Sequence, residues 1–255
     1  MMPRPGQQLA IIPISISGEV RPGDSLAEKI LDALQRQKQS FVAGDILVVK
    51  HKIVSKAEGQ FIDLETIHPS RSSRAWARRH GLDARVIELA LSQSKRVVRR
   101  RGRVLITETK HGFICANSAV DVSNVDGGLH ALLLPEDPDR SAVQIHRKLK
   151  KLLHLSIPVI ITDSFGRPWR EGLTEVAIGV AGMKPIHDYR GRRDPHGYAL
   201  HSTEEAVADE LACAAGLVCG KLEGVPACII RGFRYRAGRG SARELIRPAA
   251  QDLFR

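Results

Sequence analysis

Residues 159–172, VIITDSFGRPWREG, place an apolar run directly before Asp163 and Ser164. The run predicts a buried strand that delivers a carboxylate and a hydroxyl to a polar site, after which the chain turns at Gly166 and Pro168. Oxygen ligands of this kind suit a hard divalent cation, Mg²⁺ or Mn²⁺. The segment therefore predicts both a central strand and a candidate metal site.

The same turn carries Arg167 and Arg170, whose guanidinium groups suit phosphate or carboxylate oxygens. An ordinary strand end explains the segment equally well, because Asp and Ser form local hydrogen bonds in turns and the arginines are then simply solvated. The segment alone does not choose between a catalytic site and a turn.

A second carboxylate, Asp121, follows a strand that is expected to end at Asn117, and it lies in a polar loop with Asn124. Ligand-binding loops gather at such strand exits. Because metal sites take carboxylates from separate elements, Asp121 and Asp163 together meet the requirement for a divalent cation.

The fold class follows from the alternation of apolar runs and amphipathic stretches, which predicts an α+β protein with mixed, largely antiparallel sheets and interspersed helices. Residues 1–255 are enough for a single domain or for two closely packed subdomains. Strands are expected at residues 9–16, 104–106, 175–183 and 227–230, and helices at 26–38, 84–92, 141–153 and 204–219. A long polar loop is expected at 187–203, and its length within a compact domain indicates a functional role.

A further strand is expected to run from Asp45 past His51 to Lys56. The period of a strand would then place Lys50, Lys52 and Lys56 on one face. Such a cationic face fits polyphosphate, and it equally fits a solvated surface that discourages edge pairing.

The formal charge of +11 predicts an anionic partner: nucleic acid, a nucleotide, a phosphorylated metabolite or a polycarboxylate. The aromatic content of 4% disfavours a surface that stacks the bases of single strands. The four cysteines form no CxxC pair, which disfavours a structural zinc site. No signal-peptide pattern and no membrane-spanning apolar run is found, so a soluble, cytoplasmic protein is expected.

Five segments in one order resemble the coenzyme F420-0:L-glutamate ligase family, also called gamma-glutamyl ligases. They are GDILVVKHKIVSKAEG at 44–59, ITETKHGFICANSAVDVSN at 106–124, VIITDSFGRPWREG at 159–172, the DxxGxxDxxG spacing at 188–197, and GVPACIIRGF at 224–233. Several independent motifs in the same order are far more specific than any one of them.

The resemblance implies a GTP-dependent enzyme that attaches L-glutamate to a deazaflavin precursor, F420-0, and then adds further glutamate through γ linkages. An acyl phosphate is the intermediate expected from this chemistry. The resemblance also implies a mixed α/β architecture specific to the family, a homodimer, and a requirement for Mg²⁺ or Mn²⁺ with K⁺ as an additional cation.

Site residues carry over by position. Asp121 and Asp163 resemble ligands of one metal ion, and Ser164 resembles a ligand of a second. The remaining candidates are catalytic arginines and residues that contact the nucleotide or its cations: Arg167, Arg170, His51, Lys52, Lys56, Asn124, Gly220, Glu223 and Gly224.

Two departures from the family pattern stand out. Lys221 occupies a position where the family has an acidic or amide residue for the second metal, and a protonated lysine does not ligate metal. Either Glu223 substitutes, the ammonium takes the place of the second cation, or that metal is absent. The segment ISGEV at 16–20 also differs from the family's nucleotide-contacting turn, which leaves the base preference open.

Two alternatives remain. A related ligase would join an amino acid to a different phosphorylated or carboxylated acceptor, as the departure at Lys221 suggests. A nucleic-acid-binding protein would instead use the basic segments at 99–101 and 148–151. The second alternative is disfavoured because it leaves the carboxylates at the strand exits without a role.

Overall fold

The computed structural model describes residues 8–123 and 128–252. Its centre is a five-stranded sheet in the order β1-β12-β2-β8-β9. The strands are β1 (Ala10–Ile14), β2 (Ile46–Lys50), β8 (Val159–Arg167), β9 (Arg170–Ala181) and β12 (Ala227–Arg231). β2 and β8 run parallel, and the other neighbouring pairs are antiparallel. The predicted α+β class with largely antiparallel sheets is confirmed.

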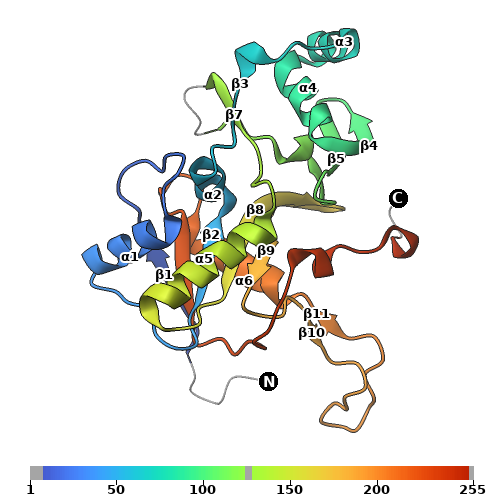
Figure 1. The fold of residues 1–255 in the computed structure, drawn as a ribbon. Coiled ribbons are helices and arrows are strands. Elements are labelled where there is room, and N and C mark those ends of the chain that lie inside the picture. The colour runs from blue at the N-terminus through green and yellow to red at the C-terminus, as the bar shows by residue number, and fades with distance from the viewer. Residues whose placement is uncertain (1–7, 124–127, 253–255) are drawn as a thin grey trace.

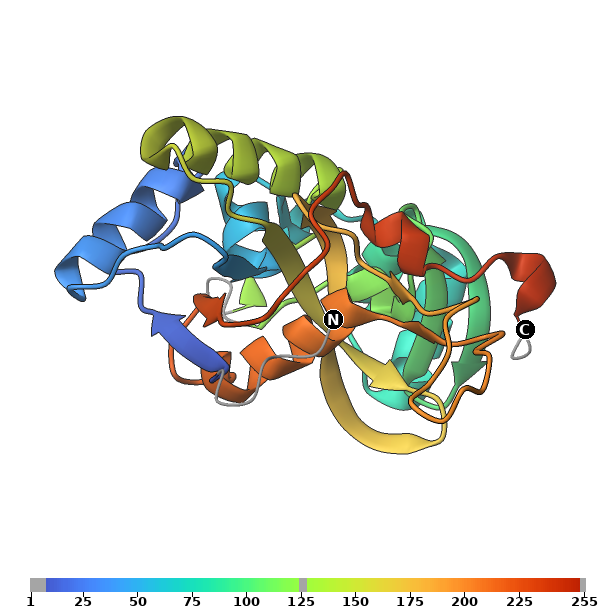
Figure 2. The same cartoon turned by 90° about the horizontal axis from the view of Figure 1, so that it is seen from below.

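Helices cover both faces of this sheet (Figures 1 and 2). α1 (Leu26–Arg36), α2 (His51–Ala57) and α5 (Pro138–Leu153) pack on one face, and α6 (Val207–Cys219) packs on the other. The alternation of β2 explains the two layers, because Leu47 and Val49 join the first core while Ile46 and Val48 join the second.

Residues 61–123 and 128–132, here called the arm, form a smaller unit beside the sheet (Figure 1). Its elements are β3 (Phe61–Asp63), α3 (Arg71–His80), α4 (Ala84–Ser92), β4 (Ser94–Arg101), β5 (Val104–Thr109), β6 (Ile114–Ala116) and β7 (His130–Leu132). A separate apolar cluster around Leu64, Trp76, Leu89 and Leu105 holds them together. The number of domains stays a prediction.

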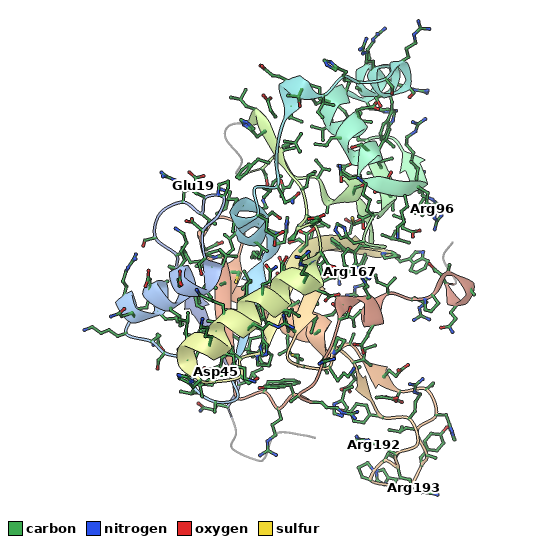
Figure 3. All side chains as sticks on the ribbon, viewed as in Figure 1. Glu19, Asp45, Arg96, Arg167, Arg192 and Arg193 are labelled. Carbon is green, nitrogen blue, oxygen red and sulfur yellow. The ribbon has the colours of Figure 1, made fainter. Side chains whose placement is uncertain are left out.

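The remaining elements are short. β10 (His187–Asp188) and β11 (Glu204–Glu205) pair at the base of the long polar loop, and 3-10 turns occupy Leu64–Thr66, Asn117–Ala119, Ala242–Leu245 and Ala249–Gln251. Figure 3 places Arg192 and Arg193 of this loop well away from Arg167. Within the described residues, no helix has both the length and the apolar character needed to cross a membrane.

The strand expected from Asp45 to Lys56 was wrong beyond Lys50, because α2 begins at His51. His51 and Ser55 are both buried, and this spacing of four residues follows the helical period. Lys52 and Lys56 therefore share one face of a helix, and Lys50 belongs to the preceding strand.

The strand ending expected at Asp163 was also wrong, because β8 continues to Arg167 and forms a hairpin with β9. What ends near Asp163 is the pairing with β2, whose last partner is Thr162 opposite Lys50. Asp163 and Ser164 therefore lie where one edge of β8 becomes open. The start of α5 differs as well: Asp137 caps it and Pro138 is its first residue, in place of the cap expected at Ser141.

Candidate functional site

Three consecutive residues at the junction of β2 and α2 each hold a carboxylate from a different element. Measured from nitrogen to carboxylate oxygen, Lys50 lies 2.7 Å from Glu175 of β9, His51 lies 3.2 Å from Asp163 of β8, and Lys52 lies 2.7 Å from Asp121 of the arm. The two predicted metal-binding carboxylates thus reach adjacent residues of one helix. We call this set of three pairs the junction.

The topology explains why these groups meet. β2 and β8 are parallel neighbours, so their carboxyl ends lie at the same edge of the sheet, where ligand sites of open sheets form. Asp121 reaches this edge because its backbone exchanges two hydrogen bonds with Leu132 of β7, at 3.0 and 2.7 Å.

His51 is 2% exposed and holds Asp163 from the protein interior. Its Nε2 faces Oδ1 of Asp163, and its Nδ1 lies 3.4 Å from the hydroxyl of Ser55, one helical turn later. The same Oδ1 accepts the backbone N–H of Ser164 at 2.7 Å. These contacts fix the direction of the Asp163 carboxylate.

Lys52 binds both Asp121 and the hydroxyl of Ser123, the latter at 2.9 Å. Burial raises the pKa of Asp121, but hydrogen bonds from Lys52 and Ser123 outweigh it, so that the pKa lies below its ordinary value. Asp121 is therefore a carboxylate at neutral pH. Lys56, one turn further along α2, lies 3.4 Å from Glu19.

Glu175 is a site residue that the sequence did not reveal. It stands opposite Ser164 in the β8–β9 register and is 6% exposed. Its Oε1 accepts hydrogen bonds from Lys50 at 2.7 Å and from the Ser164 hydroxyl at 2.6 Å. Burial raises the pKa of Glu175, yet these two bonds and the charges of Lys50 and Lys221 lower it more, so Glu175 is ionised.

The two predicted arginines lie at the far end of the same hairpin, where Arg167 and Arg170 are opposite each other. Arg167 donates to the backbone carbonyl of Glu171 at 2.8 Å, and its Nε is buried without a hydrogen-bond partner among the described residues. Arg170 is exposed. Their catalytic role stays a prediction.

The loop after α6 reaches the junction through its backbone. The carbonyl of Gly220 accepts a hydrogen bond from Lys50 at 3.2 Å. Glu223 is turned back on this loop, where its carboxylate accepts the backbone N–H of Leu222 at 2.9 Å, and Gly224 follows with a positive φ. The structure thus places Gly220 at the junction, whereas Asn124 lies outside the described residues.

Comparison with known proteins now identifies the family. Residues 16–232 match the family model described as F420-0:Gamma-glutamyl ligase. The chain belongs to this family. This gamma-glutamyl ligase is also similar to three proteins named coenzyme F420:L-glutamate ligase. The protein from Methanothermobacter thermautotrophicus is 47% identical over 92% of this chain and 94% of its own, and that from Methanopyrus kandleri is 43% identical over 97% and 98%. The protein from Methanocaldococcus jannaschii is 44% identical over 83% and 85%.

Membership makes the chain an enzyme of the ligase class. Within the described residues of this ligase, no group of three or more His, Cys, Asp and Glu side chains has a metal-binding arrangement. The predicted ligand oxygens at the junction are the carboxylates of Asp121 and Asp163 and the hydroxyl of Ser164, and Glu175 adds a third carboxylate. Two carboxylates from separate elements fit one hard divalent cation whose other ligands come from substrate and water.

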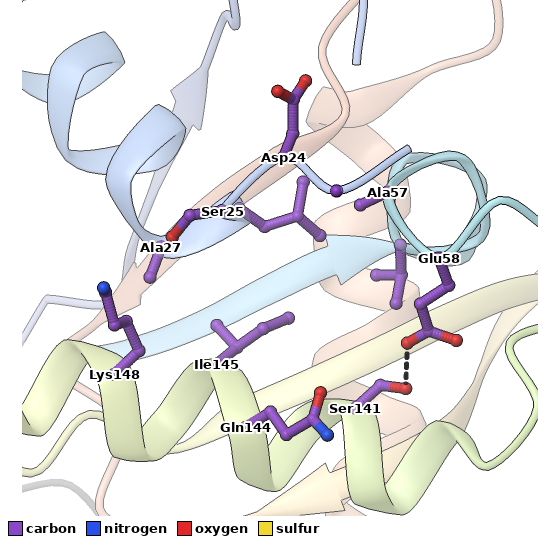
Figure 4. A pocket seen from close by; sticks show the side chains of 12 residues that line it. Asp24, Ser25, Ala27, Ala57, Glu58, Ser141, Gln144, Ile145 and Lys148 are labelled. Atoms are coloured by element: carbon purple, nitrogen blue, oxygen red, sulfur yellow. Dashed lines mark hydrogen bonds between the residues drawn. The ribbon is translucent and has the colours of Figure 1, made fainter. Parts of the chain in front are cut away.

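A separate pocket of about 390 Å³ lies at the other end of α2 (Figure 4). The first residues of α1, the end of α2 and one face of α5 enclose it, and Ser141 donates a hydrogen bond to Glu58 at its wall. None of the junction residues lines this pocket, so the ligase keeps its charged site and this pocket apart.

Proposed function

We propose that this gamma-glutamyl ligase joins L-glutamate to the F420-0 deazaflavin precursor, with GTP as phosphoryl donor, and then adds further γ-linked glutamate. The names of its relatives support the acceptor and the amino acid. The junction supports the chemistry, because it gathers three carboxylates and three basic side chains at one sheet edge. The proposal includes Mg²⁺ or Mn²⁺, with K⁺ as an additional cation.

The proposed reaction has two steps. A carboxylate oxygen of the acceptor attacks the γ-phosphorus of GTP, the bond from that phosphorus to the bridging oxygen breaks, and GDP leaves. The amine of L-glutamate then attacks the carbonyl carbon of the acyl phosphate, and inorganic phosphate leaves with the bonding electron pair. The amine loses a proton to solvent as the amide forms. Such phosphoryl transfer depends mainly on positioning and on charge neutralisation.

The residues of this chain take distinct parts in the proposal. Asp121 and Asp163 would hold one divalent metal ion, which supplies positive charge to phosphate oxygens, and Ser164 is the expected oxygen ligand of a second cation. Lys52 and Lys56 share a face of α2 one turn apart, a spacing that suits successive phosphates of the nucleotide. Buried His51 keeps Asp163 in place.

The guanidinium groups of Arg167 and Arg170 are proposed to bind carboxylates of the acceptor or of the incoming glutamate. Their position at the end of the hairpin, beyond Ser164, is compatible with substrates that extend out from the junction. The bidentate geometry of arginine suits carboxylate oxygens.

Incubation of the purified protein with GTP, Mn²⁺, L-glutamate and F420-0 tests the proposal. We expect GDP formation and products heavier by one or more glutamyl units in mass spectra. An isotopic oxygen label in the acceptor carboxylate should appear in the released phosphate, because that oxygen bridges the acyl phosphate. Product without transfer of the label would contradict the acyl-phosphate step.

Neutral variants locate the chemistry. Asp121→Asn and Asp163→Asn should each reduce turnover by about 100-fold or more, the scale of a displaced catalytic group. Glu210→Gln, an exposed acid on α6, is the matched control and should keep full turnover. Unchanged turnover in both Asp variants would contradict the assignment. GDP formation only with another acceptor would favour the related ligase suggested by Lys221.

A further inference from the structure

Lys221 reaches the buried oxygens of the junction from the solvent side. Its Nζ donates a hydrogen bond to the hydroxyl of Ser164 and lies 3.6 Å from Oε1 of Glu175. The side chain of Lys221 is 61% exposed, whereas that of Glu175 is 6% exposed. An ammonium thus caps the oxygen cluster of Ser164 and Glu175 on its open side.

Glu175 retains capacity for a further positive contact. Its Oε1 accepts from both Lys50 and Ser164, but its Oε2 is buried and has no hydrogen-bond partner among the described residues. An ionised carboxylate with an unpaired buried oxygen favours nearby positive charge. Lys50 supplies this charge from within the protein, and Lys221 supplies it from the solvent side.

The same contacts disfavour a divalent ion on Ser164. A protonated lysine has three donors and no acceptor, so it occupies the Ser164 oxygen without being able to bind metal. Lys50 and Lys221 together place two positive charges beside Glu175, and both would repel a dication there. The Glu223 carboxylate is turned toward its own loop in this conformation, where one of its oxygens accepts the backbone N–H of Leu222.

We infer that the Lys221 ammonium is the second cation of this active site, so that the chain binds one divalent ion with its nucleotide and supplies the other positive charge itself. The inference rests on the proposed function for the identity of the nucleotide. Lys221 then stands beside Ser164 as a tethered cation that neutralises phosphate oxygens during transfer. Gly220, with a φ of +51°, ends α6 and begins the loop that contains Lys221.

Counting bound Mn²⁺ tests this directly. The protein is saturated with a non-hydrolysable GTP analogue, free Mn²⁺ is measured by electron paramagnetic resonance, and binding by the analogue alone is subtracted. We expect one Mn²⁺ per chain in the wild type and in Lys221→Arg, and two in Lys221→Gln, which frees Ser164 and provides an amide oxygen. Lys151→Gln, an exposed lysine on α5, is the matched control and should bind one.

Turnover gives an independent readout. Lys221→Gln should require at least tenfold more free Mn²⁺ for half-maximal rate, with a sigmoidal dependence, whereas the wild type and Lys221→Arg should show simple saturation. Two Mn²⁺ per wild-type chain, none at all, or an unchanged count in Lys221→Gln would overturn the inference. A count of one without glutamylation of F420-0 would instead contradict the proposed function and leave the inference standing.

Discussion

A single methyl group on α6 should disable the site without unfolding the protein. In Gly216→Ala the new Cβ would lie 2.7 Å from Cγ of Glu175, whereas ordinary carbon–carbon contacts are about 3.5–4.0 Å. The Glu175 side chain must therefore shift by about 1 Å, since β9 fixes its backbone. That shift stretches the contacts of its Oε1 with Lys50 and Ser164, now 2.7 and 2.6 Å, beyond hydrogen-bond range.

Two opposing effects set the stability of this variant. Alanine is better than glycine within a helix by about 1 kcal/mol. Overpacking of a well-filled interior loses about 1–3 kcal/mol. Because the clash involves the middle of a 6% exposed side chain, the overpacking loss should exceed the propensity gain, and we expect a net loss of up to about 2 kcal/mol. Turnover should fall by about 100-fold, as expected for a displacement of about 1 Å in a catalytic cluster.

Urea unfolding and initial rates of glutamylation measure both effects in Gly216→Ala. Leu217 of the same helix is 84% exposed, so Leu217→Ala and Leu217→Gly give the propensity difference of α6 without any contact with Glu175. A Gly216→Ala variant that gains about 1 kcal/mol and keeps full turnover would refute the reasoning. That result would mean that the Glu175 carboxylate moves freely and that its order is irrelevant to the reaction.

Two further variants test other parts of the chain. Arg231 donates two hydrogen bonds of 2.8 Å to Asp45, which is fully buried, so Arg231→Ala leaves a buried charge unpaired and should lower the free energy of unfolding by about 3–5 kcal/mol. Turnover per folded molecule should not change, because the pair lies at the opposite end of β2 from Lys50. A loss of unfolding free energy under about 1 kcal/mol, measured with urea, would contradict the expected destabilisation. Burial raises the pKa of Asp209 above its ordinary 3.8, so the folded state holds this proton more tightly and loses stability as pH rises through the raised pKa. Asp209→Asn should therefore raise the melting temperature at pH 7 but not below pH 3.8, and a variant with equal effects at both pH values would refute the assignment.

The central strands were predictable because apolar runs bounded by turn residues leave few alternatives, and β2, β8 and β12 lie where such runs occur. α2 was not predictable in the same way. The stretch HKIVSK interleaves basic residues with the apolar pair Ile53 and Val54 over a short length, so strand and helix periods both fit it. The burial of His51 and Ser55, which the sequence does not show, decides for the helix.

Glu175 escaped prediction because it stands where the polar first part of β9 gives way to an apolar run, and nothing next to it in the sequence marks it as a site residue. An acidic residue at such a position requires a partner, since a buried charge is unfavourable unless it is paired. The partner, Lys50, is far away in the sequence and becomes adjacent only through the order of β2, β8 and β9. Asp121 and Asp163 were easier to find, since each comes soon after a recognisable apolar run.

The net charge of the chain did not indicate where the anion-binding site lies. Residues 71–103 of the arm contain ten arginines and one lysine against two carboxylates, which accounts for +9 of the +11 of the whole chain. The excess that predicted an anion-binding site therefore lies mostly on the arm. At the junction, three carboxylates face three basic side chains.

The balance at the junction has a physical consequence for a ligase that handles anions. Unpaired, the carboxylates of Asp121 and Glu175 would be unfavourable at a partly buried edge, and so would the ammonium groups of Lys52 and Lys50. Internal pairing stabilises all four before any substrate arrives. A nucleotide accompanied by a divalent cation brings both signs of charge at once, so carboxylates and ammonium groups can exchange partners without leaving a buried charge alone. Lys221 can exchange partners in the same way, because its ammonium pairs with Glu175 in the free enzyme and is available to phosphate oxygens in the complex.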